Sequence, residues 1–191
     1  MPQQNSNTLS ICVFCASSDH VPQRYAEVAR ELGGKMGARG IHLVYGGGSN
    51  GLMGVISREL HGVGGRITGV IPLSLKELGY AYLEADEIIV TDGLRDRKAV
   101  MEARADGFIG LPGGFGTIEE MVEVLTLRQL NLLDKPIVFM NVDGFYDGLL
   151  SQFETGYREK FILEESRTLY RVTDSVDEAL DHIEAEWRKN R

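Results

Sequence analysis

Residues 107–132 read GFIGLPGGFGTIEEMVEVLTLRQLNL, an apolar run followed by a glycine-rich turn and then a helical pattern. The run Gly107–Leu111 predicts a buried strand, and Thr117–Leu132 predicts a helix because its apolar residues recur at helical spacing. The turn between them contains three glycines that let the backbone approach a ligand closely: Gly113, Gly114 and Gly116. A strand, a tight turn and a helix in this order form the repeating unit of a parallel α/β sheet.

The same alternation extends along the chain. The other predicted strands are Leu9–Ala16, Ile41–Tyr45, Ile67–Ile71, Glu87–Val90, Pro136–Met140 and Thr168–Val172. The other predicted helices are Pro22–Ala38, Gly51–Gly62, Leu94–Ala105, Phe145–Lys160 and Ser175–Lys189. We therefore expect an α/β fold with a single doubly wound parallel sheet of about seven strands and helices on both faces. Residues 9–191 would form one nucleotide-binding domain after a flexible N-terminus, 1–8.

Charge and composition narrow the class of partner. The chain has 191 residues with 20 basic and 28 acidic side chains, a net charge of −8. This balance disfavours a nucleic-acid partner or a membrane surface and favours a small anion bound where positive charge is concentrated. No apolar run approaches the roughly 20 residues of a membrane span. The polar opening Pro2–Asn7 lacks the hydrophobic region of a signal peptide, so we expect a cytoplasmic protein.

Cys12 and Cys15 have the Cys-x-x-Cys spacing of redox and metal sites. They lie in an apolar stretch that predicts a strand, on which positions i and i+3 face opposite sides. A structural role as buried free thiols is therefore favoured over a disulfide or a metal site. The four histidines lack metal-ligand spacing, and no Gly-Lys-Ser/Thr loop is present, so we expect no metal and no cofactor.

Three glycine- and serine-rich loops follow predicted strands: Cys15–Ser18, Tyr45–Gly54 and Pro112–Thr117. Because the strands are parallel, the three loops should open on one edge of the sheet, where such folds bind ligands. Ser17 in the first loop is a candidate binding residue. Gly46, Gly47 and Gly48 lie in the second loop, where Gly46-x-Gly48-x-x-Gly51 has the spacing of the dinucleotide fingerprint. No acidic residue follows at the distance that a ribose contact needs. A second nucleotide-contacting loop and a plain strand-to-helix turn both remain open for this segment.

The start of the helix after Pro112 is the predicted anion site. Its unpaired amides and the positive end of its dipole would face a phosphate, next to Phe115 and Ile118. Thr117 and Glu120 also fit a capping box, in which both side chains bond only to backbone amides. The three glycines before them are not needed merely to begin a helix, which favours a functional role for Glu120.

Basic residues gather early in the helix Leu94–Ala105. Arg97 and Lys98 lie where cations oppose the helix dipole, so an anionic partner is indicated. The alternative is a solvated face with Lys98 paired to Glu102 one turn later.

The helix Thr117–Leu132 has apolar residues on two faces. One carries Ile118, Met121, Val122 and Leu125, and the other carries Val124, Leu127 and Leu130. A single sheet covers only one of them. The second face is buried either in a two-fold homodimer or by other elements of the same chain.

Several ordered motifs together resemble the Lonely Guy family of cytokinin riboside 5′-monophosphate phosphoribohydrolases, once widely labelled lysine decarboxylases. The resemblance covers residues 9–180. It rests on the run Pro112–Glu120, which matches Pro-Gly-Gly-x-Gly-Thr-x-x-Glu, on Cys15–Ser18, Tyr45–Gly48, Gly51–Gly54, Asp96–Lys98, Lys135–Pro136 and Asn141–Tyr146.

The resemblance implies a Rossmann-like fold, a homodimer and release of a free base and ribose 5-phosphate from a nucleoside monophosphate. Arg97 and Glu120 match the family's catalytic pair. Lys98, the segment Gly114–Glu120 including Glu119, and Thr126 match substrate-binding positions, and Glu77 lies near the family's acidic substrate contact. Leu94-Arg95 replaces the common Met-His, and Leu127 stands where plant members often have Trp.

The sequence leads to one mechanistic hypothesis and one rival. The 5′-phosphate would bind the amides of Gly113–Thr117, while Glu120 stabilises the cationic sugar or orients water and Arg97 fixes the substrate. The rival is a carrier of a phosphorylated ligand, since related proteins bind molybdenum cofactor. A pyridoxal-dependent decarboxylase is disfavoured because nothing marks Lys35, Lys76 or Lys135 as a Schiff-base residue.

Overall fold

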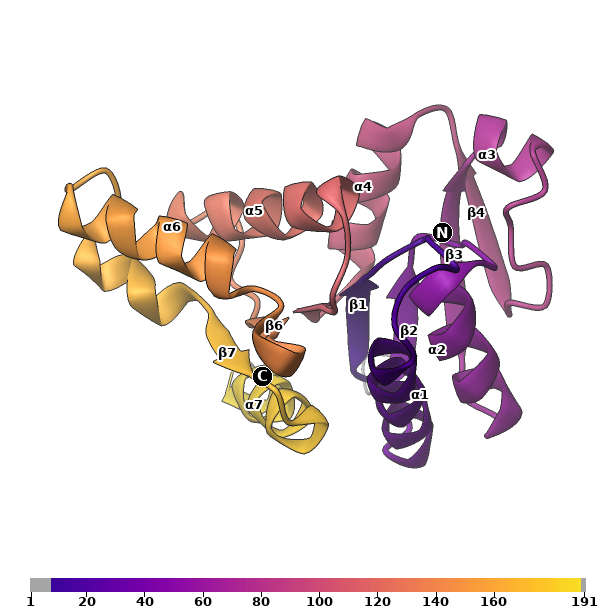
Figure 1. The fold of residues 1–191 in the computed structure, drawn as a ribbon. Coiled ribbons are helices and arrows are strands. Elements are labelled where there is room, and N and C mark those ends of the chain that lie inside the picture. Colours follow the sequence, from indigo (N-terminus) through magenta and orange to yellow (C-terminus); the bar gives the residue numbers. More distant parts are fainter. Residues whose placement is uncertain (1–7, 190–191) are drawn as a thin grey trace.

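The computed structural model describes residues 8–189. Its centre is one parallel sheet of seven strands in the order β4-β3-β2-β1-β5-β6-β7 (Figure 1). The strands are β1 Ser10–Phe14, β2 His42–Tyr45, β3 Ile67–Pro72, β4 Glu87–Thr91, β5 Gly107–Gly110, β6 Ile137–Met140 and β7 Arg171–Thr173. The predicted fold class, a doubly wound α/β sheet of about seven strands, is confirmed. The segment 1–8, predicted as a flexible N-terminus, lies outside the described residues except for Thr8.

Helices cover both faces of the sheet. They are α1 Gln23–Ala38, α2 Gly51–Gly62, α3 Leu73–Glu77, α4 Leu94–Arg104, α5 Phe115–Gln129, α6 Asp147–Arg158 and α7 Val176–Lys189, with short 3-10 helices η1 Val142–Gly144 and η2 Glu164–Leu169. Buried residues of α1, α2 and α7 pack on one face, and those of α4 and α5 pack on the other, with partly buried residues of α6. Figure 1 shows α5 and α6 extending beyond β6 and β7.

Alternation along β1 explains how one strand serves two cores. Ile11 and Val13 lie in the core beneath α1, α2 and α7, whereas Cys12 and Phe14 lie in the core on the other face. Successive side chains of a strand point to opposite sides, and a parallel sheet covered on both faces requires apolar residues at every position. Cys15 belongs to the first core and both cysteines are free, so the prediction of two structural thiols is confirmed.

Four local predictions need correction or addition. The fifth helix begins at Phe115 with Gly114 as its N-cap, two residues before the predicted start, and ends at Gln129. Thr117 therefore occupies the third position of the helix and makes no capping bond, so the capping-box interpretation is wrong. β7 begins at Arg171, because Glu164–Leu169 forms the 3-10 helix η2 instead. The short helix α3 was not anticipated.

The strand order reverses direction between β1 and β5. Strands β1 to β4 extend the sheet to one side and β5 to β7 extend it to the other. In open parallel sheets, ligands bind outside the carboxyl ends of the strands at this point. The loops after β1 and β5 are two of the three loops that the sequence singles out. Within residues 8–189, none of the helices combines the length and the apolar character that crossing a bilayer requires.

Candidate active site at the topological switch point

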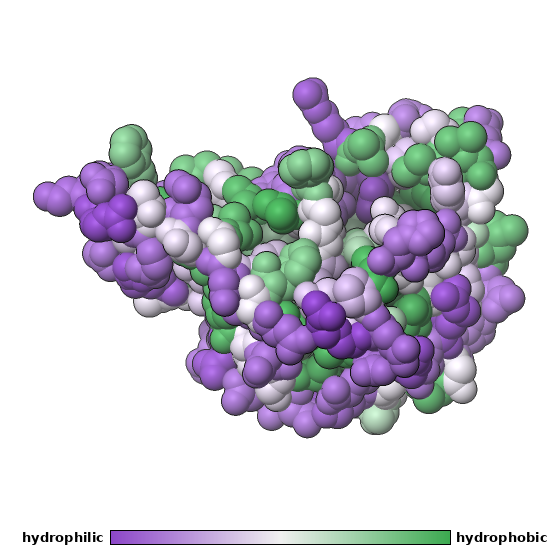
Figure 2. Space-filling model, viewed as in Figure 1, coloured by the Kyte–Doolittle hydropathy of each residue, from purple (hydrophilic) through white to green (hydrophobic). Residues whose placement is uncertain are grey.

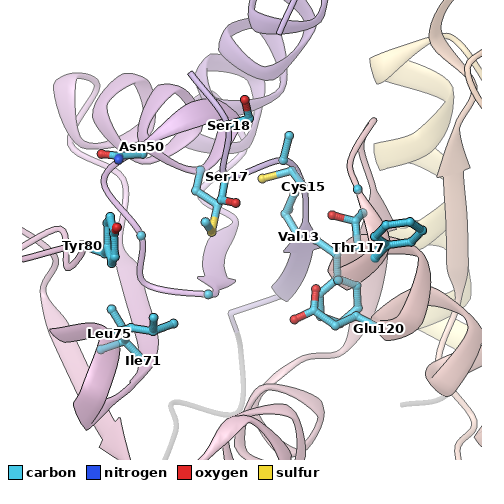
Figure 3. Close-up of a pocket in the computed structure, with 18 of the residues that line it drawn as sticks. Val13, Cys15, Ser17, Ser18, Asn50, Ile71, Leu75, Tyr80, Thr117 and Glu120 are labelled. Atoms are coloured by element: carbon cyan, nitrogen blue, oxygen red, sulfur yellow. The ribbon is translucent and has the colours of Figure 1, made fainter. Parts of the chain in front are cut away.

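A cavity of about 610 Å³ opens at this switch point. Its volume lies in the range of small-molecule sites. All three predicted loops line it, as shown by the wall residues Cys15, Ser17, Ser18, Gly46, Gly48, Asn50, Gly114, Phe115, Gly116 and Thr117. The prediction that these loops open on one edge is confirmed. Figure 3 shows Thr117 and Glu120 on one side of the cavity and Ile71, Leu75 and Tyr80 on the other.

The N-terminus of α5 offers unpaired amides to this cavity. No side chain caps the helix, and its first turn contains no acidic residue. A Cβ added at Gly114 or Gly116 would meet nothing within 4 Å, so the space beside both residues is open. Free amides at a helix start, together with the helix dipole, form a ready site for a phosphate.

The N-terminus of α2 has no such capacity, although the fingerprint-like glycines precede it. The Gly51 amide, at φ +57°, donates to Asp19 Oδ1 at 2.7 Å. The Leu52 amide donates to the Ala16 carbonyl at 2.9 Å. The chain itself thus satisfies the amides that a dinucleotide's pyrophosphate would need. Of these two helices at the cavity, only α5 presents free donors.

Arg97 and Glu120 form an ion pair inside the cavity wall. Arg97 Nη2 lies 3.3 Å from Glu120 Oε1, and the two side chains are only 13% and 10% exposed. Arg97 comes from the second turn of α4, where its amide bonds to the Gly93 carbonyl. Its Nε is buried without a partner. The structure therefore brings together the two predicted catalytic residues and leaves a donor of Arg97 unsatisfied.

Burial governs the protonation of Glu120. Desolvation raises its pKa to about 7, while Arg97 lowers the pKa and Glu119 raises it. A carboxyl group with a pKa near neutrality exchanges its proton readily at physiological pH, as acid–base catalysis requires. Cys15 in the same wall has its pKa raised far above the usual value by burial and by Glu120. It stays a neutral thiol and is not a nucleophile.

The half of the cavity opposite α5 is apolar, and the sequence did not single it out. Met53 of α2, Ile71 of β3, Leu75 of α3 and Tyr80 of the following loop line it. Leu75 and Tyr80 come from a segment without helical or strand periodicity. One sequence feature could have indicated this half of the cavity. Tyr80 is an aromatic residue soon after the carboxyl end of the third strand, where ligand-binding loops of this fold occur.

Several predicted binding residues lie outside the cavity wall. Lys98 pairs with Glu119, and with Glu123 at 2.7 Å, which joins α4 to α5. Thr126 is exposed, and its hydroxyl donates to the Val122 carbonyl at 2.7 Å. The remaining predicted residues away from the wall are Glu77, exposed on α3, Glu119, exposed on α5, and Gly47, Gly113 and Ile118.

Gly47 and Gly113 support the wall from behind. The Gly47 carbonyl accepts the Tyr82 amide at 2.9 Å. A Cβ at Gly113 would come within 2.1 Å of Thr117 Oγ1, so this glycine makes room for that hydroxyl. In residues 8–189, no group of three or more His, Cys, Asp or Glu side chains is arranged to hold a metal ion.

Solved structures share the fold. A molybdenum cofactor binding protein from Rippkaea orientalis superposes with a TM-score of 0.73 at 21% identity and covers 94% of this chain and 98% of its own. The Moco carrier protein of Chlamydomonas reinhardtii gives a TM-score of 0.73 at 20% identity, covering 96% and 99%. At this level of identity the likeness establishes the architecture alone.

Sequence relatives are more similar. The cytokinin riboside 5′-monophosphate phosphoribohydrolase LOG of Oryza sativa subsp. japonica is 44% identical over 167 residues, which cover 87% of this chain and 69% of the relative. The probable cytokinin riboside 5′-monophosphate phosphoribohydrolase LOG6 of Arabidopsis thaliana is 46% identical over 168 residues, which cover 86% of this chain and 82% of the relative. A family model described as possible lysine decarboxylase matches residues 53–183. With its fold, its glycine-rich loop before α5 and these relatives, the chain belongs to the LOG family.

Proposed function

We propose that this protein hydrolyses the N-glycosidic bond of a purine nucleoside 5′-monophosphate, giving a free base and ribose 5-phosphate. The candidate substrates are AMP and the cytokinin riboside 5′-monophosphates, and the relatives are named for the second of these. The observation that carries the proposal is the Arg97–Glu120 pair in one cavity with the open N-terminus of α5. A phosphate site and a buried carboxylate facing the same space suit a phosphorylated sugar.

In this proposal the substrate lies along the cavity with its phosphate at one end and its base at the other. The phosphate binds the amides at Gly114, Phe115, Gly116 and Thr117. The ribose then lies beside Glu120, one turn further along α5 on the cavity side. The base reaches the apolar half formed by Met53, Ile71, Leu75 and Tyr80.

Cleavage builds positive charge on the ribose ring as the bond to the base lengthens. Ionised Glu120 stabilises this charge and orients the attacking water, and Arg97 holds Glu120 and balances charge near the leaving base. Electrostatic stabilisation of this kind is effective because both groups are already desolvated, with fixed positions, before the substrate binds. No metal or cofactor takes part in this scheme.

The rival function is carriage of a phosphorylated ligand such as molybdenum cofactor. The fold is compatible with this function too, because a molybdenum cofactor binding protein and a Moco carrier protein share it. A carrier needs the anion site at α5 but has no use for a carboxylate of raised pKa beside the sugar. Glu120 therefore favours the hydrolase.

The test incubates the purified protein with AMP and with isopentenyladenosine 5′-monophosphate, and follows the free base by chromatography. We expect base release from at least one nucleotide and none from the matching nucleosides, because the phosphate anchors the substrate. Binding without release would support a carrier, and release from nucleosides at equal rates would contradict the phosphate site.

We further propose a homodimer and a cytoplasmic location. The C-terminal end of α5 and the neighbouring segments expose large apolar side chains, namely Leu130, Leu132, Phe161 and Leu163. Figure 2 shows apolar residues at the surface over α5. A second copy would cover this surface. The reduced state of Cys12 and Cys15 is consistent with a reducing compartment.

A further inference from the structure

Residues 80–82 form a strap that closes the apolar half of the cavity. Ala81 makes an antiparallel bridge with Gly48. The Ser49 amide donates to the Tyr80 carbonyl at 2.8 Å, and the Tyr82 amide donates to the Gly47 carbonyl at 2.9 Å. The strap thus pairs with the glycine loop after β2 as a short extra strand does.

A buried tyrosine anchors one end of this strap. Tyr82 is 7% exposed, and its hydroxyl donates to Glu84 at 3.1 Å and lies 3.0 Å from His61 Nδ1. Gly79, at φ +80°, turns the chain into the strap at its other end. The Tyr80 amide also donates to the Leu75 carbonyl at 3.2 Å, so hydrogen bonds at its amide and its carbonyl fix the backbone of Tyr80.

The Tyr80 side chain, in contrast, is 47% exposed and lines the cavity. Figure 3 shows it beside Leu75 and Ile71, on the side opposite Thr117 and Glu120. No hydrogen bond of its hydroxyl to another described residue is found, so the backbone, and not a side-chain hydrogen bond, positions the ring. An aromatic ring with a fixed backbone and a free face is preorganised to stack on a flat ligand group.

We propose that Tyr80 is the stacking platform for the substrate's base and the residue that makes the apolar half selective for planar heteroaromatic groups. The inference rests on the proposed function, because the phosphate at α5 and the sugar at Glu120 orient the base toward the strap. Met53, Ile71 and Leu75 complete a surface that desolvates the base without bonding to it.

The experiment measures binding in a Glu120→Gln background, so that hydrolysis does not consume the ligand. Dissociation constants for AMP and for ribose 5-phosphate are determined by calorimetry. Tyr80→Ala should weaken AMP binding about 10-fold, since stacking of a base on an aromatic ring is lost. Ribose 5-phosphate, which has no base, should bind with unchanged affinity, and Tyr80→Phe should restore AMP binding.

Leu83→Ala is the matched control, because Leu83 lies on the same loop, is exposed and does not line the cavity. It should leave both constants unchanged. An equal loss for the two ligands in Tyr80→Ala, or no loss for AMP, would overturn the stacking role. If AMP binds through Tyr80 but the unmodified protein releases no base, the proposed function fails and this inference stands. If AMP does not bind at all, both fail.

Discussion

At the scale of single residues, Glu120 shows how burial creates a reactive group. The same Thr-x-x-Glu pattern fits a capping box in the sequence, but the helix begins at Phe115 and leaves Glu120 in its second turn. There the whole residue is 8% exposed, and its carboxylate faces Arg97 instead of a backbone amide. Its role therefore depends on a two-residue difference in where α5 begins.

Glu120→Gln should reduce kcat/KM for nucleotide hydrolysis at least about 100-fold, because the neutral amide cannot stabilise a cationic sugar.

In the unmodified enzyme, kcat/KM should rise with pH and level off above pH 7, since Glu120 must be ionised and its pKa is about 7. A rate that falls through this range would instead identify Glu120 as a proton donor.

The same substitution should stabilise the protein at alkaline pH. The folded-state pKa of Glu120, about 7, lies above its ordinary value of 4.5, so the folded protein binds more protons between these values. Stability from this group is present below pH 4.5 and is lost as pH rises to 7. Glu120→Gln should therefore raise the free energy of unfolding by on the order of 2–3 kcal/mol at pH 8 and by much less at pH 5. Thermal unfolding at the two pH values measures this difference, and equal shifts would contradict it.

Gly46 and Gly48 give a matched pair of substitutions. A Cβ at Gly46 would lie 2.1 Å from Arg97 Nη2, whereas a Cβ at Gly48 would lie 2.7 Å from Met53 Cε, the end of a flexible side chain. Gly46→Ala should displace the Arg97 guanidinium and lower kcat about 100-fold. Gly48→Ala should retain most of kcat because Met53 can move. Steady-state kinetics of both variants decides, and equal losses of kcat would show that the loop, not Arg97, is affected.

At the scale of elements, ion pairs join the two helices that carry the proposed catalytic residues. Arg97 and Glu120 belong to α4 and α5, and the adjacent residue Lys98 joins these helices through Glu119 and Glu123. The Lys98 side chain is only 12% exposed, whereas those of its partners Glu119 and Glu123 are 59% and 38% exposed. Lys98 thereby acts on the site through helix position.

Lys98→Met should lower kcat about 10-fold, because α4 and α5 lose a shared ion pair and Arg97 shifts relative to Glu120. The double variant Glu119→Gln, Glu123→Gln should lose a similar factor if Lys98 works through these two partners. Kinetics on both variants separates this role from the predicted contact with substrate. A loss confined to Lys98→Met, seen mainly in KM, would support the substrate contact.

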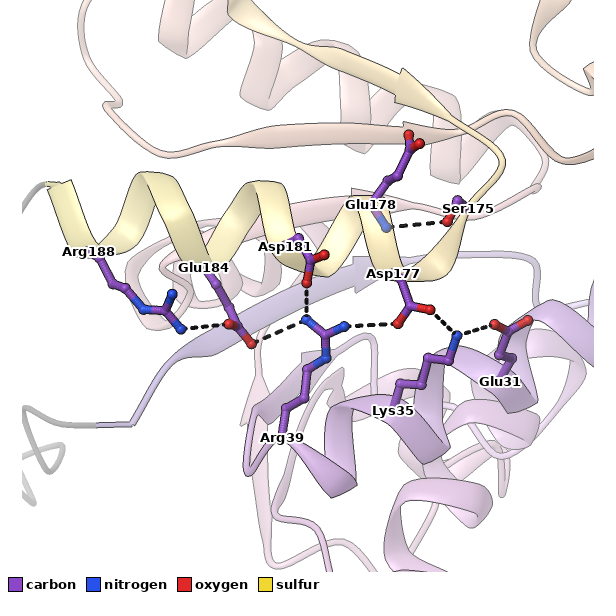
Figure 4. A network of polar contacts seen from close by, with 9 residues as sticks. All are labelled: Glu31, Lys35, Arg39, Ser175, Asp177, Glu178, Asp181, Glu184 and Arg188. Carbon is purple, nitrogen blue, oxygen red and sulfur yellow. Dashed lines mark hydrogen bonds and ion pairs between the residues drawn. The ribbon is translucent and has the colours of Figure 1, made fainter.

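A second inter-helix network joins α1 to α7 on the opposite face of the sheet (Figure 4). Arg39 contacts Asp177 at 2.9 Å, Asp181 at 2.5 Å and Glu184 at 3.5 Å, and Lys35 contacts Asp177 at 2.7 Å. Single exposed ion pairs contribute little, but shared partners make a network more effective. It attaches the last helix to the first.

Arg39→Ala should lower the free energy of unfolding by about 1 kcal/mol and the melting temperature by about 2–4 °C. Its control is Arg30→Ala, which removes a solitary pair at 4.0 Å with Glu59 and should change stability by less than about 0.5 kcal/mol. Thermal unfolding at low and high salt measures both, and the Arg39 effect should shrink in high salt. A salt-independent loss would point to packing of the Arg39 stem instead.

At the scale of the whole molecule, the projecting end of α5 bears on oligomeric state. Leu130 and Leu132 are 59% and 71% exposed, so other elements of the same chain do not bury them. Leu130→Glu combined with Leu132→Glu should convert a dimer to monomers in light scattering after size exclusion. Leu78→Glu, at an exposed leucine near α3, is the control and should not change the mass. A monomeric unmodified protein would refute the dimer.

The layers of the fold and the loops of the site could be predicted from the amino-acid sequence. Local periodicity indicates the strands and helices, and the carboxyl ends of parallel strands share one edge, so the three loops followed from order along the chain. Local pattern indicated Arg97 and Glu120 separately, and the family resemblance implied that they act as a pair. Local pattern also suggested an anion at the glycine turn before α5. These inferences need only neighbours in sequence and the direction of the strands.

Which backbone amides and side chains remain without a partner in the cavity depends on contacts between distant parts of the chain. The amides of α2 are satisfied by Ala16 and Asp19, more than thirty residues earlier in the chain, whereas those at the start of α5 remain open. The apolar half of the cavity gathers Met53, Leu75 and Tyr80 from separate elements. Such choices depend on contacts between distant segments, and burial from several sides sets the pKa of Glu120. The sequence pattern predicts neither these long-range contacts nor the burial of Glu120, because both arise only when the chain folds.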